Sequence, residues 1–172
     1  MTEDSKALRG SEPSRRNRRS VARLAAVQAL YQIDLTAASC EQVIAEFRSH
    51  RLDEIRGKDA ADAEFFSELV GGVVSRRAEI DSLLAPLLAE GWTLDRLEKV
   101  LRAILRAGAF EILARGDVPA AVIIDEYVRV AHAFFSEREP GVVNGILDRL
   151  ARSVRASEFE GRPRAEQDAQ DR

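Results

Sequence analysis

The stretch from Thr93 to Pro119, "TLDRLEKVLRAILRAGAFEILARGDVP", decides the fold class of this chain. Its apolar residues recur at spacings of three and four and form one broad face, made of Leu97, Val100, Leu101, Ile104 and Leu105. This spacing is typical of an α-helix with one buried side. Thr93 is a candidate N-cap, and Gly116 with Pro119 beyond it is a stop signal. The stretch therefore predicts a long amphipathic helix.

The same helical period recurs along most of the chain, and no segment alternates as a half-buried strand would. We therefore predict an all-α fold with about seven helices, near residues 18–35, 43–55, 62–74, 80–88, 93–115, 119–135 and 139–155. Gly71 and Gly72 lie inside the third of these, where each costs roughly 1 kcal/mol relative to alanine. Close contact with another helix would explain them.

The two ends of the chain lack this period. We expect residues 1–17 to form a flexible basic arm and residues 156–172 a disordered polar tail. Residues 18–155 would then form a single helical domain, with halves at roughly 18–89 and 92–155.

Composition excludes several classes of protein. The longest apolar runs fall well short of the ~20 residues that cross a bilayer, so we expect no membrane partner. Cys40 is the single cysteine, which excludes a disulfide framework and fits the cytoplasm. There is no Gly-rich phosphate loop, and two histidines do not build the usual zinc sites. We predict neither catalysis nor a metal or cofactor.

Positive charge is concentrated near the N-terminus, although the formal net charge is −3. The segment from Pro13 to Leu24 holds five arginines and no carboxylate: Arg15, Arg16, Arg18, Arg19 and Arg23. Cations at a helix N-terminus are disfavoured by a few tenths of a kcal/mol each. In a helix, Arg15, Arg19 and Arg23 would form one row, with Arg16 beside it.

Guanidinium groups bind phosphates in a bidentate manner and stack on bases. The row of arginines therefore favours nucleic-acid binding, without separating RNA from DNA. A solvated tail and a site for an acidic protein partner are the alternatives.

Four separated blocks of sequence resemble the NusB family of bacterial transcription antitermination factors. They are "AVQALY" at 26–31, "ILRAGAFEIL" at 104–113, "DVPAAVIIDEYVRVAHAF" at 117–134 and "VNGILD" at 143–148. The resemblance extends from about residue 18 to residue 150. One block alone would be weak evidence for the resemblance, but four blocks in the family's order are specific evidence for it.

The resemblance implies two small helical bundles packed together and no catalysis. It implies binding of the single-stranded boxA element of nascent ribosomal RNA, with the ribosomal protein NusE, within the RNA polymerase antitermination complex. It also implies support of rRNA transcription and maturation. By position in the family the RNA-binding residues would be Arg18, Arg19, Arg23, Gln28, Tyr31 and Phe134, and the arginine cluster adds Arg15 and Arg16. The partner-binding residues would be Arg106, Glu111 and Arg138, of which the first two could equally serve packing or an internal salt bridge.

Two positions depart from the family pattern. Arg138 stands where an acidic residue is usual, and Val142 where the family has phenylalanine, which puts contacts at that surface in doubt. Two other functions stay open: a helical protein-interaction module, and an RNA-binding domain cut from an rRNA methyltransferase. The latter would need an α/β domain after the helices, whereas this sequence ends at Arg172. A homodimer also stays open.

Overall fold

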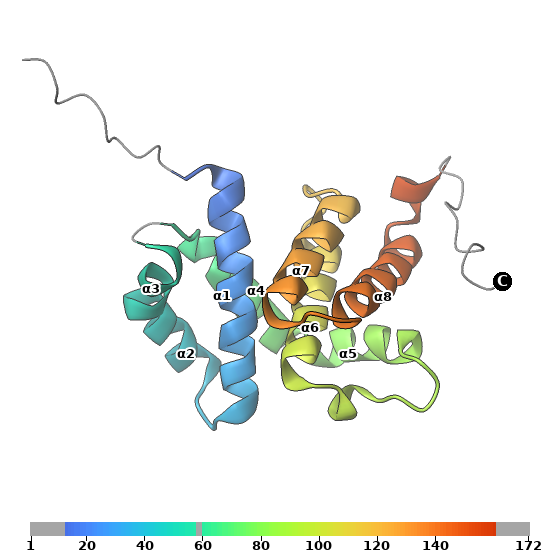
Figure 1. The fold of residues 1–172 in the computed structure, drawn as a ribbon, viewed down its shortest axis with the longest axis horizontal. Coiled ribbons are helices and arrows are strands. Elements are labelled where there is room, and N and C mark those ends of the chain that lie inside the picture. The colour runs from blue at the N-terminus through green and yellow to red at the C-terminus, as the bar shows by residue number, and fades with distance from the viewer. Residues whose placement is uncertain (1–12, 58–59, 161–172) are drawn as a thin grey trace, which may run out of the picture.

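The computed structural model describes residues 13–57 and 60–160, and all of its regular structure is helical (Figure 1). The predicted all-α class is confirmed. The α-helices are α1 Arg15–Leu35, α2 Cys40–Glu46, α3 Leu52–Arg56, α4 Ala63–Ser75, α5 Arg77–Leu84, α6 Lys99–Ala114, α7 Ala120–Phe134 and α8 Glu139–Val154. A π-helical turn, η1 Phe47–Arg51, joins α2 to α3 without a break, and 3₁₀ turns lie at η2 Ala85–Leu87, η3 Leu94–Arg96 and η4 Ala156–Phe159. Counting 40–56 as one helix, the described residues form seven helices.

The helices form two groups that share one apolar core. α1 packs on α2, α3 and α4, and α6 packs on α5, α7 and α8, while α1 and α6 join the groups (Figure 1). The division at 18–89 and 92–155 stays a prediction. In the structure α5 packs mainly against α6, so the first group as we see it ends with α4.

α6 is the central helix. Every residue from Leu101 to Ile112 is buried, including two arginines and a glutamate, so the helix is enclosed on all sides rather than amphipathic. The predicted N-cap at Thr93 is wrong, because α6 begins at Lys99. There the Glu98 carboxylate accepts hydrogen bonds from the backbone N–H groups of Val100 and Leu101, which suits the positive end of a helix.

One of the two glycines in α4 marks a close helix contact. A side chain at Gly72 would overlap the ring of Phe110 on α6, whereas a Cβ at Gly71 would meet nothing within 4 Å. The expected close approach therefore explains Gly72 and not Gly71.

The ordered structure extends beyond the predicted domain at both ends. α1 begins at Arg15, where the Ser14 hydroxyl accepts a hydrogen bond from the Asn17 N–H, so part of the predicted arm is helical. At the other end η4 lies inside the predicted tail. Arg155 holds this end by donating hydrogen bonds to four backbone carbonyls, those of Glu111, Ile112, Arg115 and Val118. Residues 1–12 and 161–172 lie outside the described part. No helix in that part is long and apolar enough to cross a bilayer.

Candidate nucleic-acid interface

The first turn of α1 carries an open cluster of positive charge. Arg15, Arg16 and Arg18 are exposed, and this turn contains no acidic residue. Arg15 and Arg18 form no ion pair with any described residue, and Arg16 has a single carboxylate neighbour, Glu126, at 3.8 Å. Cationic surface therefore remains available at this end of the helix.

Arg19 is turned toward α4 and is half-buried. Its guanidinium lies 5.2 Å from the centre of the Phe65 ring, which is within the range of a cation–π contact. Its Nε is buried and has no hydrogen-bond partner among the described atoms. Arg19 is thus only partly available to a ligand.

Arg23 lies in the interior, with 3% of its side chain exposed. It donates from two nitrogens to the Glu111 carboxylate, with Nε 3.0 Å from Oε2, and it lies 3.6 Å from Glu126. The Tyr127 hydroxyl donates to the same Glu111 oxygen at 2.8 Å. The predicted row of Arg15, Arg19 and Arg23 therefore does not form one open surface, because Arg23 is buried. Glu111 is also fully buried and is not placed to touch a partner.

The buried network of Arg23, Glu111 and Tyr127 shifts the pKa values of two of its own members. Burial acts to lower the pKa of Arg23, but the hydrogen bond and attraction of Glu111 outweigh it, and the pKa is raised. Burial raises the pKa of Tyr127 well above its usual value, and the nearby Glu111 charge adds to this. The network therefore holds a charged arginine and a protonated tyrosine, and it joins α1, α6 and α7.

Of the other two predicted partner residues, one is buried and one is exposed. Arg106 is buried and donates to both Asp81 oxygens, at 2.8 and 2.9 Å, and to Asp34 at 3.4 Å. It ties α6 to α5 and α1, which is the internal salt bridge that the sequence left open beside a partner contact. Arg138 lies exposed at the start of α8, where its role in partner binding stays a prediction.

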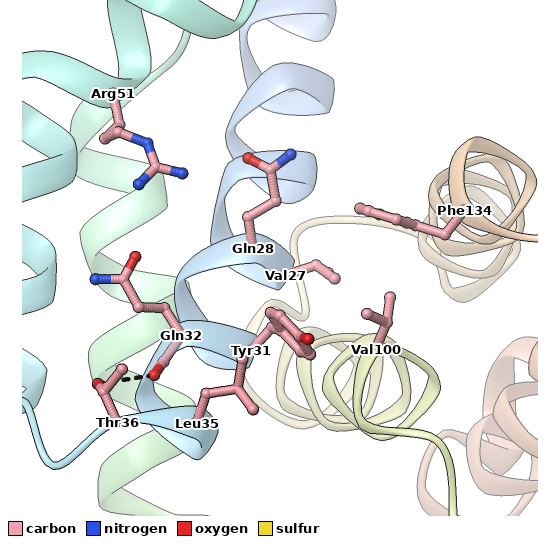
Figure 2. Close-up of a pocket in the computed structure, with 9 residues that line it drawn as sticks. All are labelled: Val27, Gln28, Tyr31, Gln32, Leu35, Thr36, Arg51, Val100 and Phe134. Carbon is pink, nitrogen blue, oxygen red and sulfur yellow. Dashed lines mark hydrogen bonds between the residues drawn. The ribbon is translucent and has the colours of Figure 1, made fainter.

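A groove of about 480 Å³ brings three predicted RNA-binding residues together, namely Gln28 and Tyr31 from α1 and Phe134 from the end of α7 (Figure 2). Phe134 is 38% exposed, a large value for an aromatic side chain. The other lining residues are Val27, Gln32, Leu35, Thr36, Arg51 and Val100. Aromatic rings beside amide groups can stack on an unpaired base and hydrogen-bond its edge.

Sequence analysis missed Arg51, which lies across Gln28 from Phe134 in this groove (Figure 2). It comes from the π-helical turn η1, and its guanidinium lies 4.7 Å from the Phe47 ring centre and 3.5 Å from Glu46. The helical period puts Arg51 one turn after Phe47, but it does not show that α1 lies opposite and closes the groove. The basic segment 48–51, "RSHR", was the one available signal.

Comparison with known proteins shows the family that the chain resembles. A model of the NusB family matches residues 20–152. The chain is 49% identical to the transcription antitermination protein NusB of Bradyrhizobium sp. over 88% of its length and 92% of that protein. It is 51% identical to NusB of Rhizobium rhizogenes, covering 81% of this chain and 89% of that one.

Solved structures show the same fold. NusB of T. maritima superposes with a TM-score of 0.69 at 32% identity, covering 86% of this chain and 99% of that one. The antitermination factor NusB from a crystal structure with NusE and double-stranded RNA also gives 0.69, at 27% identity, covering 81% and 99%.

Proposed function

The chain belongs to the NusB family, and we propose that it acts in transcription antitermination by binding a boxA-type single-stranded RNA together with a NusE-type ribosomal protein. The observation that carries this proposal is the continuity of two features on α1. The open arginines stand at its first turn, and the aromatic groove opens three to four turns further along the same helix.

The two features would bind different parts of an RNA strand. Arg15, Arg16 and Arg18 present guanidinium groups that suit phosphate oxygens, which supply affinity and salt dependence. Tyr31 and Phe134 offer ring surfaces for an unpaired base, and Gln28 offers an amide for its edge. Arg19, which is half-buried against Phe65 of α4, would add positive charge next to the exposed arginines.

The NusE-type partner is proposed from the relative solved with NusE and RNA. Among the predicted partner residues, Arg138 is the one whose side chain is exposed. As part of the RNA polymerase antitermination complex, the protein would support rRNA transcription and maturation without catalysis, in the cytoplasm.

Binding to a labelled boxA-type RNA and to a scrambled RNA of the same composition tests the proposal. Each titration is run with and without a NusE-type protein, on chain of known mass in solution. We expect tighter binding to boxA than to the scrambled strand, and a further gain with the partner present. Equal affinity for both RNAs in every condition would leave only non-specific charge attraction and would refute the proposed role.

A further inference from the structure

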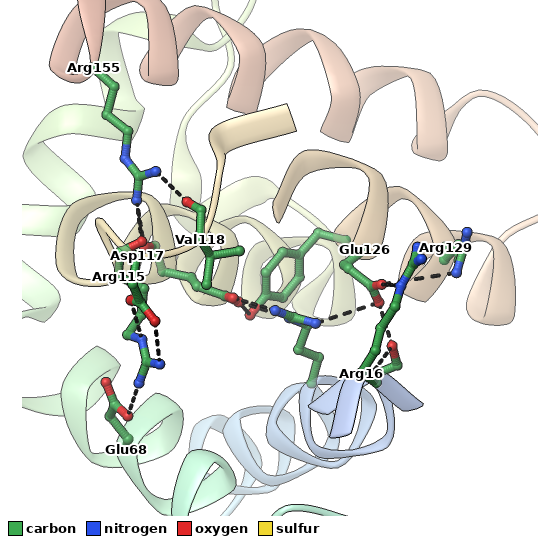
Figure 3. A network of polar contacts seen from close by, with 12 residues as sticks. Arg16, Glu68, Arg115, Asp117, Val118, Glu126, Arg129 and Arg155 are labelled. Carbon is green, nitrogen blue, oxygen red and sulfur yellow. Dashed lines mark hydrogen bonds and ion pairs between the residues drawn. The ribbon is translucent and has the colours of Figure 1, made fainter. Parts of the chain in front are cut away.

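The Glu126 carboxylate on α7 lies near three guanidinium groups that come from two helices. Its side chain is 4% exposed, and it lies 3.6 Å from Arg23, 3.8 Å from Arg16 and 3.9 Å from Arg129. The Ser20 hydroxyl donates a hydrogen bond to it at 2.8 Å. Arg16 of α1 and Arg129 of α7 both lie near the same oxygen of this carboxylate, Oε1 (Figure 3).

The charges in this cluster do not balance. Three guanidinium groups share two carboxylates, because Arg23 is also paired with Glu111. The excess positive charge lies on the outer members, since the side chains of Arg16 and Arg129 are 69% and 67% exposed. Their separations from Glu126 exceed hydrogen-bonding distance. Neither guanidinium donates a hydrogen bond to a described atom, so their N–H groups are open to a ligand.

We propose that Arg129 and Arg16 together bind one phosphate of the RNA strand across the seam between α1 and α7. Glu126 is the positioning residue beneath them. This inference rests on the proposed function. It adds a phosphate contact on a second helix, which the sequence pattern of α1 did not indicate. The site includes Arg16 of the exposed first turn of α1, and on α7 Arg129 precedes by five residues Phe134, which lines the aromatic groove.

Glu126 prepares this pair for an anion. Two long arginine side chains would otherwise repel each other and sample many rotamers. A buried carboxylate, fixed by Ser20 and Arg23, attracts both groups toward one place without using their N–H donors. Ordering them before the ligand arrives reduces the entropy lost on binding, and two guanidinium groups can then donate to one phosphate.

The test is a salt titration of full-length protein with a labelled boxA-type single-stranded RNA. For Arg129→Gln we expect the Kd to rise about three- to tenfold near 0.1 M salt, and the log–log salt slope to fall by about 0.7. Arg129→Lys should keep the wild-type slope, because it keeps the charge. Arg149→Gln is the matched control, an exposed arginine on α8 rather than on the seam. It should leave both quantities unchanged.

The alternative results are distinct. If wild-type protein prefers boxA RNA and Arg129→Gln binds it equally well, the phosphate site is refuted while the proposed function stands. If Arg129→Gln weakens binding of the NusE-type protein but not of RNA, Arg129 contacts protein and the inference is again wrong. An equal loss in Arg149→Gln would mean that overall charge, and not this site, sets the affinity. Loss of boxA preference in the wild type would refute the proposed function itself.

Discussion

Arg16 and Arg23 lie seven residues apart on α1 and both face Glu126, yet their surroundings differ. Arg23 is 3% exposed and is held by two hydrogen bonds to Glu111. Arg16 is 69% exposed and lies 3.8 Å from its one carboxylate neighbour. The same side chain is thus a structural cross-link at one position and an open cation two turns earlier. Depth in the helix interface, and not residue type, separates the two roles.

Buried arginines also cross-link helices on α6. Arg106 pairs with Asp81 and Asp34, and Arg102 donates to Asp34 at 3.1 Å. These pairs connect α6 to α5 and to the end of α1, as Arg23 connects α1 to α6. Removing one member of such a pair leaves its partner's charge buried and uncompensated, which is costly.

The largest effect should follow from breaking the inner pair. We expect Arg23→Met to lower the free energy of unfolding by about 3–5 kcal/mol, because Glu111 is left charged in the interior. Urea denaturation measures the change. The double variant Arg23→Met with Glu111→Gln should recover part of the loss, since it also removes the stranded carboxylate. Equal destabilisation of the single and double variants would contradict this account.

Removing the outer arginines should affect binding instead of folding. For the triple variant Arg15→Gln, Arg16→Gln and Arg18→Gln, we expect boxA affinity to fall about 30- to 100-fold and the salt slope to fall by about 2. The free energy of unfolding should change by less than about 0.5 kcal/mol, as for other exposed substitutions. A control triple at the exposed positions Arg77, Arg96 and Arg149 changes the net charge equally. A matching loss of affinity there would show that net charge alone decides binding.

The aromatic groove offers a contact of a different kind. We expect Phe134→Ala to weaken RNA binding by about 1–2 kcal/mol through lost base stacking. The salt slope should stay unchanged, because no phosphate contact is removed. Val154→Ala, a similarly exposed apolar residue on α8, provides the control. A reduced slope in Phe134→Ala would indicate that the ring positions the arginines rather than a base.

Helical period was sufficient to predict the all-α fold, and the four sequence blocks were sufficient to predict the family. Which arginines of α1 are buried and which are exposed could not be predicted from the sequence. Glu111 and Glu126, the carboxylates that pair with Arg23 in the interior, lie 88 and 103 residues after it. Gln28, Tyr31 and Phe134 were found by resemblance and do line one groove. Arg51 was missed as a groove residue, and Arg129 as a member of the cluster at Glu126, because for both of them the deciding neighbours come from α1, a different helix.

The smallest expected effect gives the sharpest comparison, because two measured quantities should move in opposite directions. Arg15 occupies the first position of α1 after the Ser14 cap, next to the positive end of the helix dipole. Arg15→Glu should therefore raise the free energy of unfolding by about 0.3–1 kcal/mol at low salt. The same variant should bind boxA RNA more weakly, since a phosphate contact is replaced by a repulsive carboxylate. Arg15→Gln should fall between wild type and Arg15→Glu in both measurements. If Arg15→Glu keeps its RNA affinity, this arginine does not contact a phosphate, and if the variant loses stability, the arginine supports the helix instead of opposing its dipole.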